Sequence, residues 1–232
     1  MLGTPRLHLA VTASTNDRAR ELAALGAPHG ALVTAGLQTA GRGRQGRTWS
    51  APAGAALLMS LVLRDAPPLL PLLAAVAVAD ACGPQATIKW PNDVLLDGRK
   101  VAGILAEGRP AEGWVVLGIG VNVAVAPDDL PAELRDTAAT LGLGRGAVEP
   151  FLARLLAGLQ EALERPVEAT LEAWRARDAL HGQAITWGAG AGVARGIDGE
   201  GRLVVELADG GRTALNAGEV HLGRRRPAAE QT

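Results

Sequence analysis

A stretch rich in glycine and arginine restricts the fold of this chain more than any other segment, and it reads Gln38-Thr39-Ala40-Gly41-Arg42-Gly43-Arg44-Gln45-Gly46-Arg47-Thr48-Trp49. Its glycines disfavour a helix or a strand interior, because glycine loses more backbone freedom on ordering than any other residue. The stretch is therefore expected to be a loop whose backbone a ligand can approach closely. Each guanidinium offers a planar set of donors suited to carboxylate or phosphate oxygens, which indicates anion capture. A solvated hairpin tip is the alternative interpretation, since basic runs often lie on the surface or contact nucleic acid.

The segments around this loop predict an α+β fold with several strands in succession. Apolar or alternating stretches indicate strands at residues 6–11, 31–38, 55–63, 86–90, 94–96, 100–107 and 114–123. Ser14 resembles an N-cap that opens a helix closed by Gly26, and further helices are expected at residues 69–82, 151–163 and 167–180. Residues 127–146 are expected to be irregular. Because most strands are not separated by helices, an alternating parallel sheet is not expected.

From residue 181 onward the pattern changes to short strands separated by glycine turns. These strands are expected at residues 183–187, 192–196, 202–207 and 212–216, and together they predict a small β-barrel. We therefore divide the chain into a larger domain at residues 1–180, a small C-terminal β-barrel domain at residues 181–224 and a disordered tail at residues 225–232.

Charge and composition restrict the classes of function. The net charge of −1 gives no steering of the whole protein toward nucleic acid or a membrane. The single cysteine, Cys82, excludes an internal disulfide and fits a reducing compartment. No signal peptide is recognised, and the longest apolar run, residues 67–79, is too short for a membrane helix, so a cytoplasmic protein is expected. Of the 23 basic residues only Lys89 and Lys100 are lysines, which indicates either a coincidence in a small sample or two sites that need a compact ammonium.

Three motifs in order resemble those of the biotin protein ligases. The first is Ser14-Thr15-Asn16, and the second is the loop at residues 38–49. The third is Lys89-Trp90-Pro91-Asn92-Asp93, followed after an Asp97-Gly98 turn by Lys100-Val101-Ala102-Gly103-Ile104-Leu105. Each motif alone is weak, but the ordered set is specific, and the resemblance extends from about residue 6 to residue 223.

The resemblance implies a class II synthetase-like catalytic domain. Its sheet would be mixed and largely antiparallel, with helices packed on one side, and the small barrel would follow it. The implied reaction uses Mg²⁺ and ATP to convert biotin into biotinyl-5′-AMP, and then transfers biotin to a lysine of the biotin carboxyl carrier protein or domain of a carboxylase. Because the first strand begins near residue 6, no room is left for an N-terminal winged helix, so we expect a monofunctional ligase with no DNA partner and no membrane partner. Both a homodimer through sheet edges and a monomer are compatible with the family.

The resemblance also implies roles for individual residues. Catalysis is assigned to Lys100, Arg42 and Arg44. Biotin binding is assigned to Ser14, Thr15, Asn16, Gln38, Gly41, Arg42, Gly43, Arg44, Lys100 and Gly103. ATP binding is assigned to Arg42, Arg44, Arg47, Trp49, Lys89, Asn92, Asp93 and Asn122.

Some of these roles have alternatives. Asp93 either organises its loop through Lys89, binds Mg²⁺ together with ATP, or caps a turn. Trp49 either packs against biotin or anchors the loop, and anchoring is favoured. Arg47 either contacts ATP phosphates or forms a salt bridge within the closed loop. The four histidines have no ligand-like spacing, so no metal site built from protein ligands alone is expected.

Two other functions remain open. A lipoate ligase would use the same adenylation chemistry on a different acid. An RNA-binding protein would use the Arg/Gly stretch to follow a phosphate backbone, but the chain has one Phe and no Tyr, and base-stacking surfaces need exposed aromatic residues. The match of residues 41–46 to Gly-x-Gly-x-x-Gly does not indicate a dinucleotide site, because no helix is expected after it.

Overall fold

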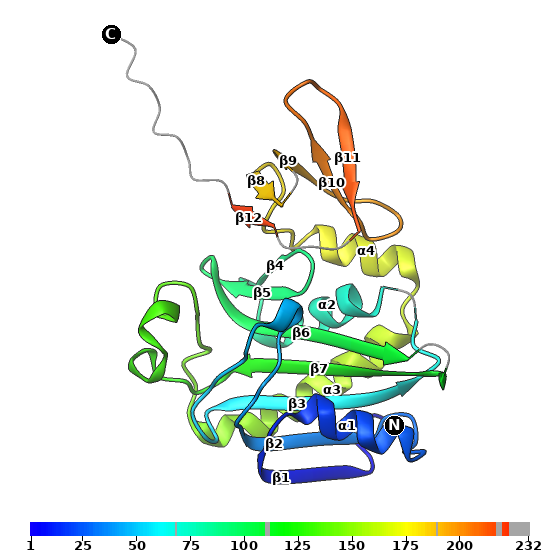
Figure 1. Cartoon of the computed structure of the whole chain (residues 1–232), viewed down its shortest axis with the longest axis vertical. Helices are drawn as coiled ribbons and strands as arrows, with labels where there is room; N and C mark the ends of the chain where they lie inside the picture. Colours follow the sequence, from blue (N-terminus) through cyan, green and yellow to red (C-terminus); the bar gives the residue numbers. More distant parts are fainter. Residues whose placement is uncertain (68, 110–111, 189, 217–219, 223–232) are drawn as a thin grey trace.

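A seven-stranded mixed sheet forms the centre of the computed structural model, which describes residues 1–67, 69–109, 112–188, 190–216 and 220–222 (Figure 1). The strands lie in the order β1-β2-β3-β7-β6-β5-β4. Their bounds are β1 Arg6–Thr12, β2 Leu32–Gln38, β3 Ala56–Arg64, β4 Thr87–Lys89, β5 Asp93–Leu96, β6 Arg99–Arg109 and β7 Trp114–Asn122. Only the β1–β2 pair is parallel among these described strands, so the predicted mixed and largely antiparallel sheet is confirmed.

Three helices cover one face of this sheet, as predicted, but the first helix covers the other. The three are α2 Leu70–Cys82, α3 Val148–Glu164 and α4 Val167–Arg175, and their apolar side chains share one core with the sheet. Helix α1, Thr15–Ala24, packs Ala19 and Ala23 against Val33, Val62 and Val116 on the opposite face. Small side chains on α1 let its backbone approach the strands closely, and this leaves the N-terminal end of α1 beside the sheet.

The strands and helices begin and end close to the predicted positions, with one exception. The helix expected at residues 167–180 ends at Arg175, because the chain then joins the edge strand β4. Ile88 N–H donates to the Arg177 carbonyl at 2.7 Å, and Ala179 N–H donates to the Ile88 carbonyl at 2.9 Å. These backbone bonds complete an edge of the sheet that a longer helix would leave open. The irregular region contains three short 3₁₀ turns, η3 Pro127–Asp129, η4 Ala132–Leu134 and η5 Arg145–Ala147.

The C-terminal strands form a second sheet of five antiparallel strands. They are β8 Ala184–Trp187, β9 Gly190–Ile197, β10 Leu203–Glu206, β11 Arg212–Leu215 and β12 His221–Leu222. Their order is β11-β10-β9-β8-β12, so β11 and β12 are the edges and the described strands do not close into the predicted barrel. The predicted tail at residues 225–232 lies outside the described residues.

The second sheet is tied to the main domain by contacts near Gly201. Trp90 Nε1–H donates to the Gly201 carbonyl at 3.1 Å, and the guanidinium of Arg175 donates to the Ile197 carbonyl. A side chain at Gly201 would collide with Leu69 and Leu72 of the main domain. The boundary at residues 180 and 181 stays a prediction.

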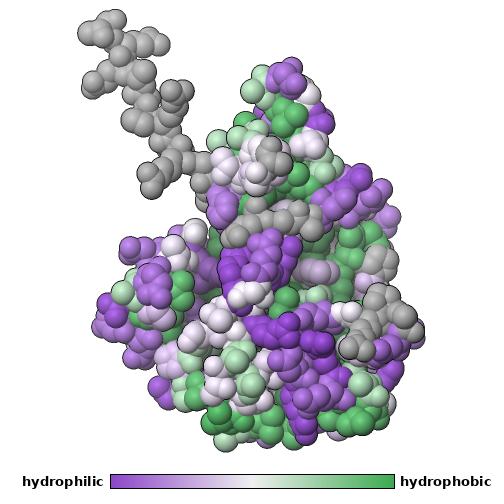
Figure 2. All heavy atoms as spheres, viewed as in Figure 1, coloured by the Kyte–Doolittle hydropathy of each residue, from purple (hydrophilic) through white to green (hydrophobic). Residues whose placement is uncertain are grey.

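The outer face of the molecule divides by polarity. Hydrophilic residues form a band across the middle of the face seen in Figure 1, with apolar patches below it (Figure 2). Within the part of the chain that is described, no helix is both long and apolar enough to cross a membrane.

Candidate active site

A cavity of about 450 Å³ lies over the face of the sheet that carries α1. It is bounded by the start of α1, the end of β2, the loop at residues 38–49, and strands β4 to β7. All of the predicted site residues except Gly41 line it, although they come from segments far apart in the sequence. Gly41 lies directly beside the cavity, where an added Cβ would be 2.7 Å from Gln38 Nε2.

Buried polar groups form the floor of the cavity at the start of α1. Thr15 N–H donates to Gln38 Oε1 at 2.7 Å, and Thr15 Oγ1 lies 2.9 Å from the same oxygen. Ser60 Oγ, on the central strand β3, lies 2.8 Å from Thr15 Oγ1 and 2.6 Å from Asn16 Oδ1. Asn16 and Ser14 are only 4% and 2% exposed, so their polar groups depend on protein or ligand partners instead of bulk water. Ser14 precedes α1 but makes no side-chain cap bond, which leaves its hydroxyl available to a ligand.

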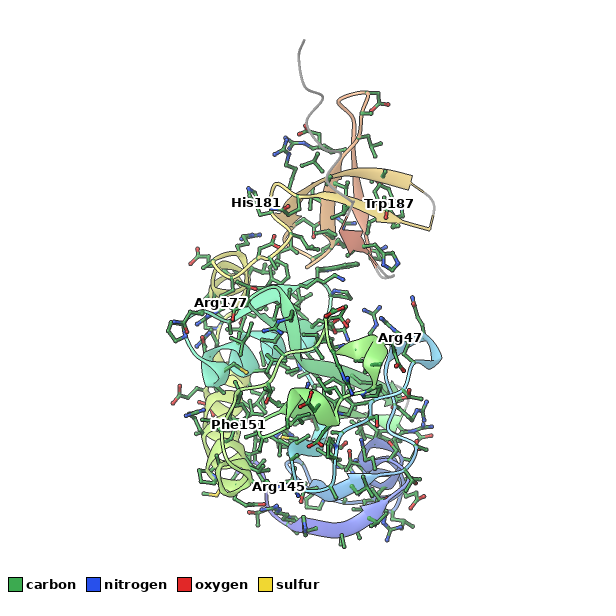
Figure 3. The ribbon with its side chains drawn as sticks, turned by 90° about the vertical axis from the view of Figure 1, so that its left-hand side faces the viewer. Arg47, Arg145, Phe151, Arg177, His181 and Trp187 are labelled. Atoms are coloured by element: carbon green, nitrogen blue, oxygen red, sulfur yellow. The ribbon has the colours of Figure 1, made fainter. Side chains whose placement is uncertain are left out.

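The loop at residues 38–49 forms a small hairpin over this floor. Gly43 N–H donates to the Arg47 carbonyl at 2.7 Å, and Trp49 N–H donates to the Gly41 carbonyl at 2.9 Å. At the tip of the hairpin Gln45 adopts a left-handed conformation with φ 55°, as tight hairpin turns require. Figure 3 shows the loop with Arg47 at the side of the main sheet, below the C-terminal sheet.

Arg42 joins this loop to the sheet and to α1 through two carboxylates. Its guanidinium lies 2.6 Å from Asp17 on α1 and 3.0 Å from Glu107 on β6. The pKa of Arg42 is raised above its ordinary value, chiefly by the hydrogen bond to Asp17 and then by the negative charge of Glu107. The guanidinium is 41% exposed, so solvent screens these pairs, and they hold the loop in place more than they stabilise the fold.

Lys100 and Trp49 meet beside Gly103 in the wall of the cavity. Lys100 Nζ lies 2.7 Å from Asp93 Oδ1 and 5.7 Å from the centroid of the Trp49 ring, within the range of a cation–π contact. The indole of Trp49 lies against the bare backbones of Gly103 and Gly120, where an added Cβ would touch it. This position fits the favoured interpretation of Trp49 as an anchor of the loop.

Asp93 pairs with Lys100 and not with Lys89, contrary to the first alternative considered for it. Lys89 and Asp93 are opposite each other in the β4–β5 register, but the ion pair joins Asp93 to Lys100 of β6. A bulge in the β5–β6 pairing shifts the register between Val94 and Leu95, and this irregularity could not be foreseen from strand patterns. In the described residues no group of three His, Cys, Asp or Glu side chains is placed to hold a metal ion.

Arg44, Asn92 and Asn122 also line the cavity. Arg44 Nη1 donates to Asn92 Oδ1 at 3.2 Å, while Asn92 Nδ2 donates to the Ile104 carbonyl at 2.9 Å and so holds β6 next to the loop. Asn122 Nδ2 donates to the Ala139 carbonyl at 2.9 Å, which turns its Oδ1 away from that bond. Asn122 Oδ1 and Trp49 Nε1 are both buried without a hydrogen-bond partner among the described residues.

Several residues at or beside the cavity were not predicted from the sequence. Ser60 lies within a predicted apolar strand and has no signal of its own, although it is fully buried and in contact with polar groups. Glu107 stands at the end of a predicted strand, where a charged residue is ordinarily solvated. Gly118 has no signal of its own, but an added Cβ there would overlap Asn16 Oδ1, so its lack of a side chain makes room for Asn16. Asp136 also lines the cavity and comes from the irregular region, whose path cannot be read from a pattern.

Comparison with known proteins assigns the family. Residues 9–123 match the biotin/lipoate A/B protein ligase family, and residues 189–223 match the biotin protein ligase C-terminal domain. The biotin–[acetyl-CoA-carboxylase] ligase of Paracoccus denitrificans is 42% identical over 241 residues, covering 93% of this chain and 99% of that protein. The bifunctional ligase/repressor BirA of Bacillus subtilis is 37% identical over 246 residues, covering 96% of this chain and 75% of that protein. The structure of the Aquifex aeolicus biotin protein ligase in complex with biotin and ATP aligns with a TM-score of 0.79 at 25% identity, over 95% of this chain and 100% of that one. The chain therefore belongs to the biotin/lipoate A/B protein ligase family, and within it to the biotin protein ligases.

Proposed function

We propose that this protein activates biotin with ATP as biotinyl-5′-AMP and transfers the biotinyl group to a lysine of a biotin carboxyl carrier domain. The observation that carries the proposal is the division of one cavity into a polar, uncharged floor and a cationic end. Thr15, Asn16 and Gln38 supply the floor, and Lys100 and Arg44 belong to the other end. Biotin has a neutral ureido ring joined by a hydrocarbon chain to a carboxylate, so its ring fits uncharged polar partners and its carboxylate fits cations.

The first chemical step brings two anions together, and the cationic end lowers its barrier. A biotin carboxylate oxygen forms a bond to the α-phosphorus of ATP, and the bond from that phosphorus to the bridging oxygen of pyrophosphate breaks, with pyrophosphate taking the electron pair. Lys100 and Arg44 are held before the reaction by Asp93 and Asn92, so they stabilise the developing charge without reorganising. We assign Arg42 two roles: its backbone lies over biotin, and its guanidinium keeps the loop closed through Asp17 and Glu107.

The second step uses the same adenylate. The acceptor lysine nitrogen forms an amide bond to the biotinyl carbonyl carbon, the bond from that carbon to the phosphate oxygen breaks, and AMP leaves with the electron pair. Two protons leave the attacking ammonium and pass to solvent or buffer. Trp49 and the hairpin cover the adenylate, which keeps water from hydrolysing the mixed anhydride before the lysine arrives.

The residues for the nucleotide line the part of the cavity beyond Lys100. We assign Lys89, Asn92 and Arg47 to the phosphates, and the unpaired Asn122 Oδ1 and Trp49 Nε1 to groups of the nucleotide half. Asp93 lines the same part of the cavity and fits Mg²⁺, because one carboxylate with phosphate oxygens and water satisfies that ion. Bound with ATP, Mg²⁺ would neutralise phosphate charge.

The proposal favours biotin over lipoate and over RNA. Gln38, Thr15 and Asn16 line the floor with oxygens that can accept from an N–H group, and a dithiolane ring has no N–H to donate to them. Arg42 is already bound by two carboxylates, so the loop is not an open track of cations for a phosphate backbone. We place the enzyme in the cytoplasm with its carboxylase, without a DNA partner, and as a monomer or as a homodimer through the sheet edge β1.

The test is pyrophosphate release by the purified protein with Mg-ATP and no acceptor, with biotin and lipoate supplied separately. Release with biotin, together with a trapped acyl-adenylate and labelling of a carrier domain, is the expected outcome. Release with lipoate alone would show that lipoate is the substrate, while the adenylation reaction would stand as proposed. Release with neither would overturn the proposal, and salt-sensitive RNA binding would then be measured.

A further inference from the structure

A chain of hydrogen bonds links the floor of the cavity to the loop that covers it. It runs from Gln38 through Thr15, Ser60 and Asn16 to Glu107. The last member, Glu107, does not line the cavity itself, and its side chain is 22% exposed. Its carboxylate is nevertheless in contact with both the floor and the loop, because Oε2 accepts from Asn16 Nδ2 at 2.8 Å and Oε1 lies 3.0 Å from Arg42 Nη2.

The two ends of this chain determine how its amides are turned. A backbone N–H can only donate, so the Gln38 atom that faces Thr15 N at 2.7 Å has to be the carbonyl oxygen. A carboxylate can only accept, so the Asn16 atom that faces Glu107 has to be the amide nitrogen. Asn16 Oδ1 is therefore turned toward Ser60 at 2.6 Å, and both hydroxyls lie between two acceptor oxygens.

Counting hydrogens shows that the chain is one donor short. There are three oxygen–oxygen contacts: Gln38 Oε1 to Thr15 Oγ1 at 2.9 Å, Thr15 Oγ1 to Ser60 Oγ at 2.8 Å, and Ser60 Oγ to Asn16 Oδ1 at 2.6 Å. Thr15 and Ser60 each supply one hydroxyl hydrogen, so two hydrogens serve three contacts. In every arrangement one of the three oxygen–oxygen contacts has no hydrogen between its atoms, although Gln38 Oε1 always accepts from Thr15 N–H, and two oxygens held this close without a hydrogen repel each other.

A ligand that enters the cavity can supply the missing hydrogen. Thr15, Asn16 and Gln38 line the cavity, whereas Ser60 is fully buried. An N–H group of a ligand can donate to a lining oxygen at the contact that has no hydrogen, and so offset the repulsion between its two oxygens. The floor therefore matches a ligand that donates N–H and does not match one of similar shape that only accepts.

We propose that Glu107 is a specificity-determining positioning residue, which orients Asn16 as an acceptor and so makes the floor select a ligand with an N–H donor. This inference rests on the proposed function, because it concerns how the ureido ring of biotin is recognised. Glu107 acts through Asn16 and touches no reacting atom. Its ion pair with Arg42 places the covering loop over the same floor that Asn16 completes.

Glu107→Gln tests the role of the carboxylate with almost no change in shape. A glutamine can donate to Asn16 Oδ1, so Asn16 can turn and donate to Ser60, Ser60 to Thr15, and Thr15 to Gln38. All three contacts are then filled and the need for a ligand donor disappears. We expect the KM for biotin to rise about tenfold, close to the contribution of one hydrogen bond, while the KM for ATP moves much less.

Isosteric analogues of biotin test the role of Glu107 in selectivity, because a purely structural role would leave the preference between the analogues unchanged. In the two cyclic carbamate analogues of biotin, one or the other ureido N–H is replaced by oxygen. Wild-type protein is expected to prefer biotin over at least one of them by about tenfold, and Glu107→Gln is expected to reduce this preference to about twofold. The matched control is Asp17→Asn, which removes the other carboxylate on Arg42 but leaves Asn16 untouched, and it is expected to keep the wild-type preference.

Affinities are measured by calorimetry and KM values by pyrophosphate release without acceptor. A wild-type protein that binds biotin and both carbamates equally would overturn the inference whether or not the variant folds. The same holds if Glu107→Gln keeps the full preference, or if Asp17→Asn loses it equally. Absence of pyrophosphate release from wild-type protein with biotin would instead refute the proposed function, so the two failures are distinguishable.

Discussion

Lys100→Ala should separate a catalytic role of Lys100 from its structural role. The ammonium lies 2.7 Å from Asp93 Oδ1, and the Asp93 side chain is only 17% exposed. Removal of the cation leaves that mostly buried carboxylate without its ion-pair partner, which costs about 1–3 kcal/mol. For a chain of this length the melting temperature should fall by roughly 5 °C. The chemistry should suffer more, because a fixed group that stabilises developing charge contributes about 10²–10³ in rate.

A double-mutant cycle with Asp93→Asn distinguishes the two effects. An asparagine needs no cation, so the double variant should regain most of the stability that Lys100→Ala loses. Adenylation should stay at least about a hundredfold below wild type in the double variant, since the cation is still missing. Lys100→Arg keeps the charge, but its wide planar head replaces a compact ammonium where an added Cβ at Gly103 would already be 3.2 Å from Lys100 Nζ, so it should not restore activity.

The assays are thermal melts of the four proteins of the cycle and pyrophosphate release with biotin and Mg-ATP. Strict additivity of the two stability changes, within about 0.5 kcal/mol, would refute the energetic coupling of Lys100 and Asp93. Normal pyrophosphate release by Lys100→Ala would refute the catalytic assignment, whatever the melts show.

Two further predictions concern the floor and the single thiol. Gly118→Ala should raise the KM for biotin about tenfold or more, because the added methyl overlaps Asn16 Oδ1; Gly158→Ala, where an added Cβ meets nothing within 4 Å, is the control and should leave that KM unchanged. Burial raises the pKa of the Cys82 thiol to about 12, so only about one molecule in 10⁴ carries the thiolate at pH 8, and alkylation should be negligible until the protein unfolds. Since the pKa of this thiol is higher in the folded than in the unfolded protein, stability should fall as the pH rises from about 9 toward 12. Cys82→Ala should reduce this dependence of stability on pH. Rapid alkylation of the native protein, or an unchanged pH dependence in the variant, would contradict the burial of the thiol.

Most helices and strands could be predicted because each is encoded by a pattern within its own segment. Strand β3 is an apolar run, and the turn before β6 carries Asp97 and Gly98, both of which adopt positive φ, at 50° and 72°. Cavity residues were predicted by resemblance to a family, and their clustering in one cavity agrees with that assignment, while their individual roles stay predictions.

What could not be predicted depends on pairs of residues that are distant in the sequence. Asn16 and Glu107 are 91 positions apart, and neither residue signals the other. The same applies to the bulge that brings Asp93 to Lys100, and to α1, whose alanines give no sign of which face of the sheet they cover. Local patterns determine which element forms, whereas these contacts are decided by how the elements pack.

Three glycines leave the site face of β6 and β7 without side chains at the points where Asn16 of α1, Trp49 of the loop and Lys100 of β6 approach it. Gly103 and Gly120 are cross-strand neighbours, and Gly118 lies two residues from Gly120 on the same face of β7. Each makes room for a different group: Gly118 for Asn16, Gly120 for the Trp49 indole, and Gly103 for both Trp49 and the stem of Lys100. These three glycines therefore let the start of α1, the loop and the Lys100 side chain approach the backbone of the sheet closely. Alanine at 118 should accordingly impair recognition of the ring, alanine at 120 should impair closure of the loop, and alanine at 103 should impair both loop closure and placement of the cation.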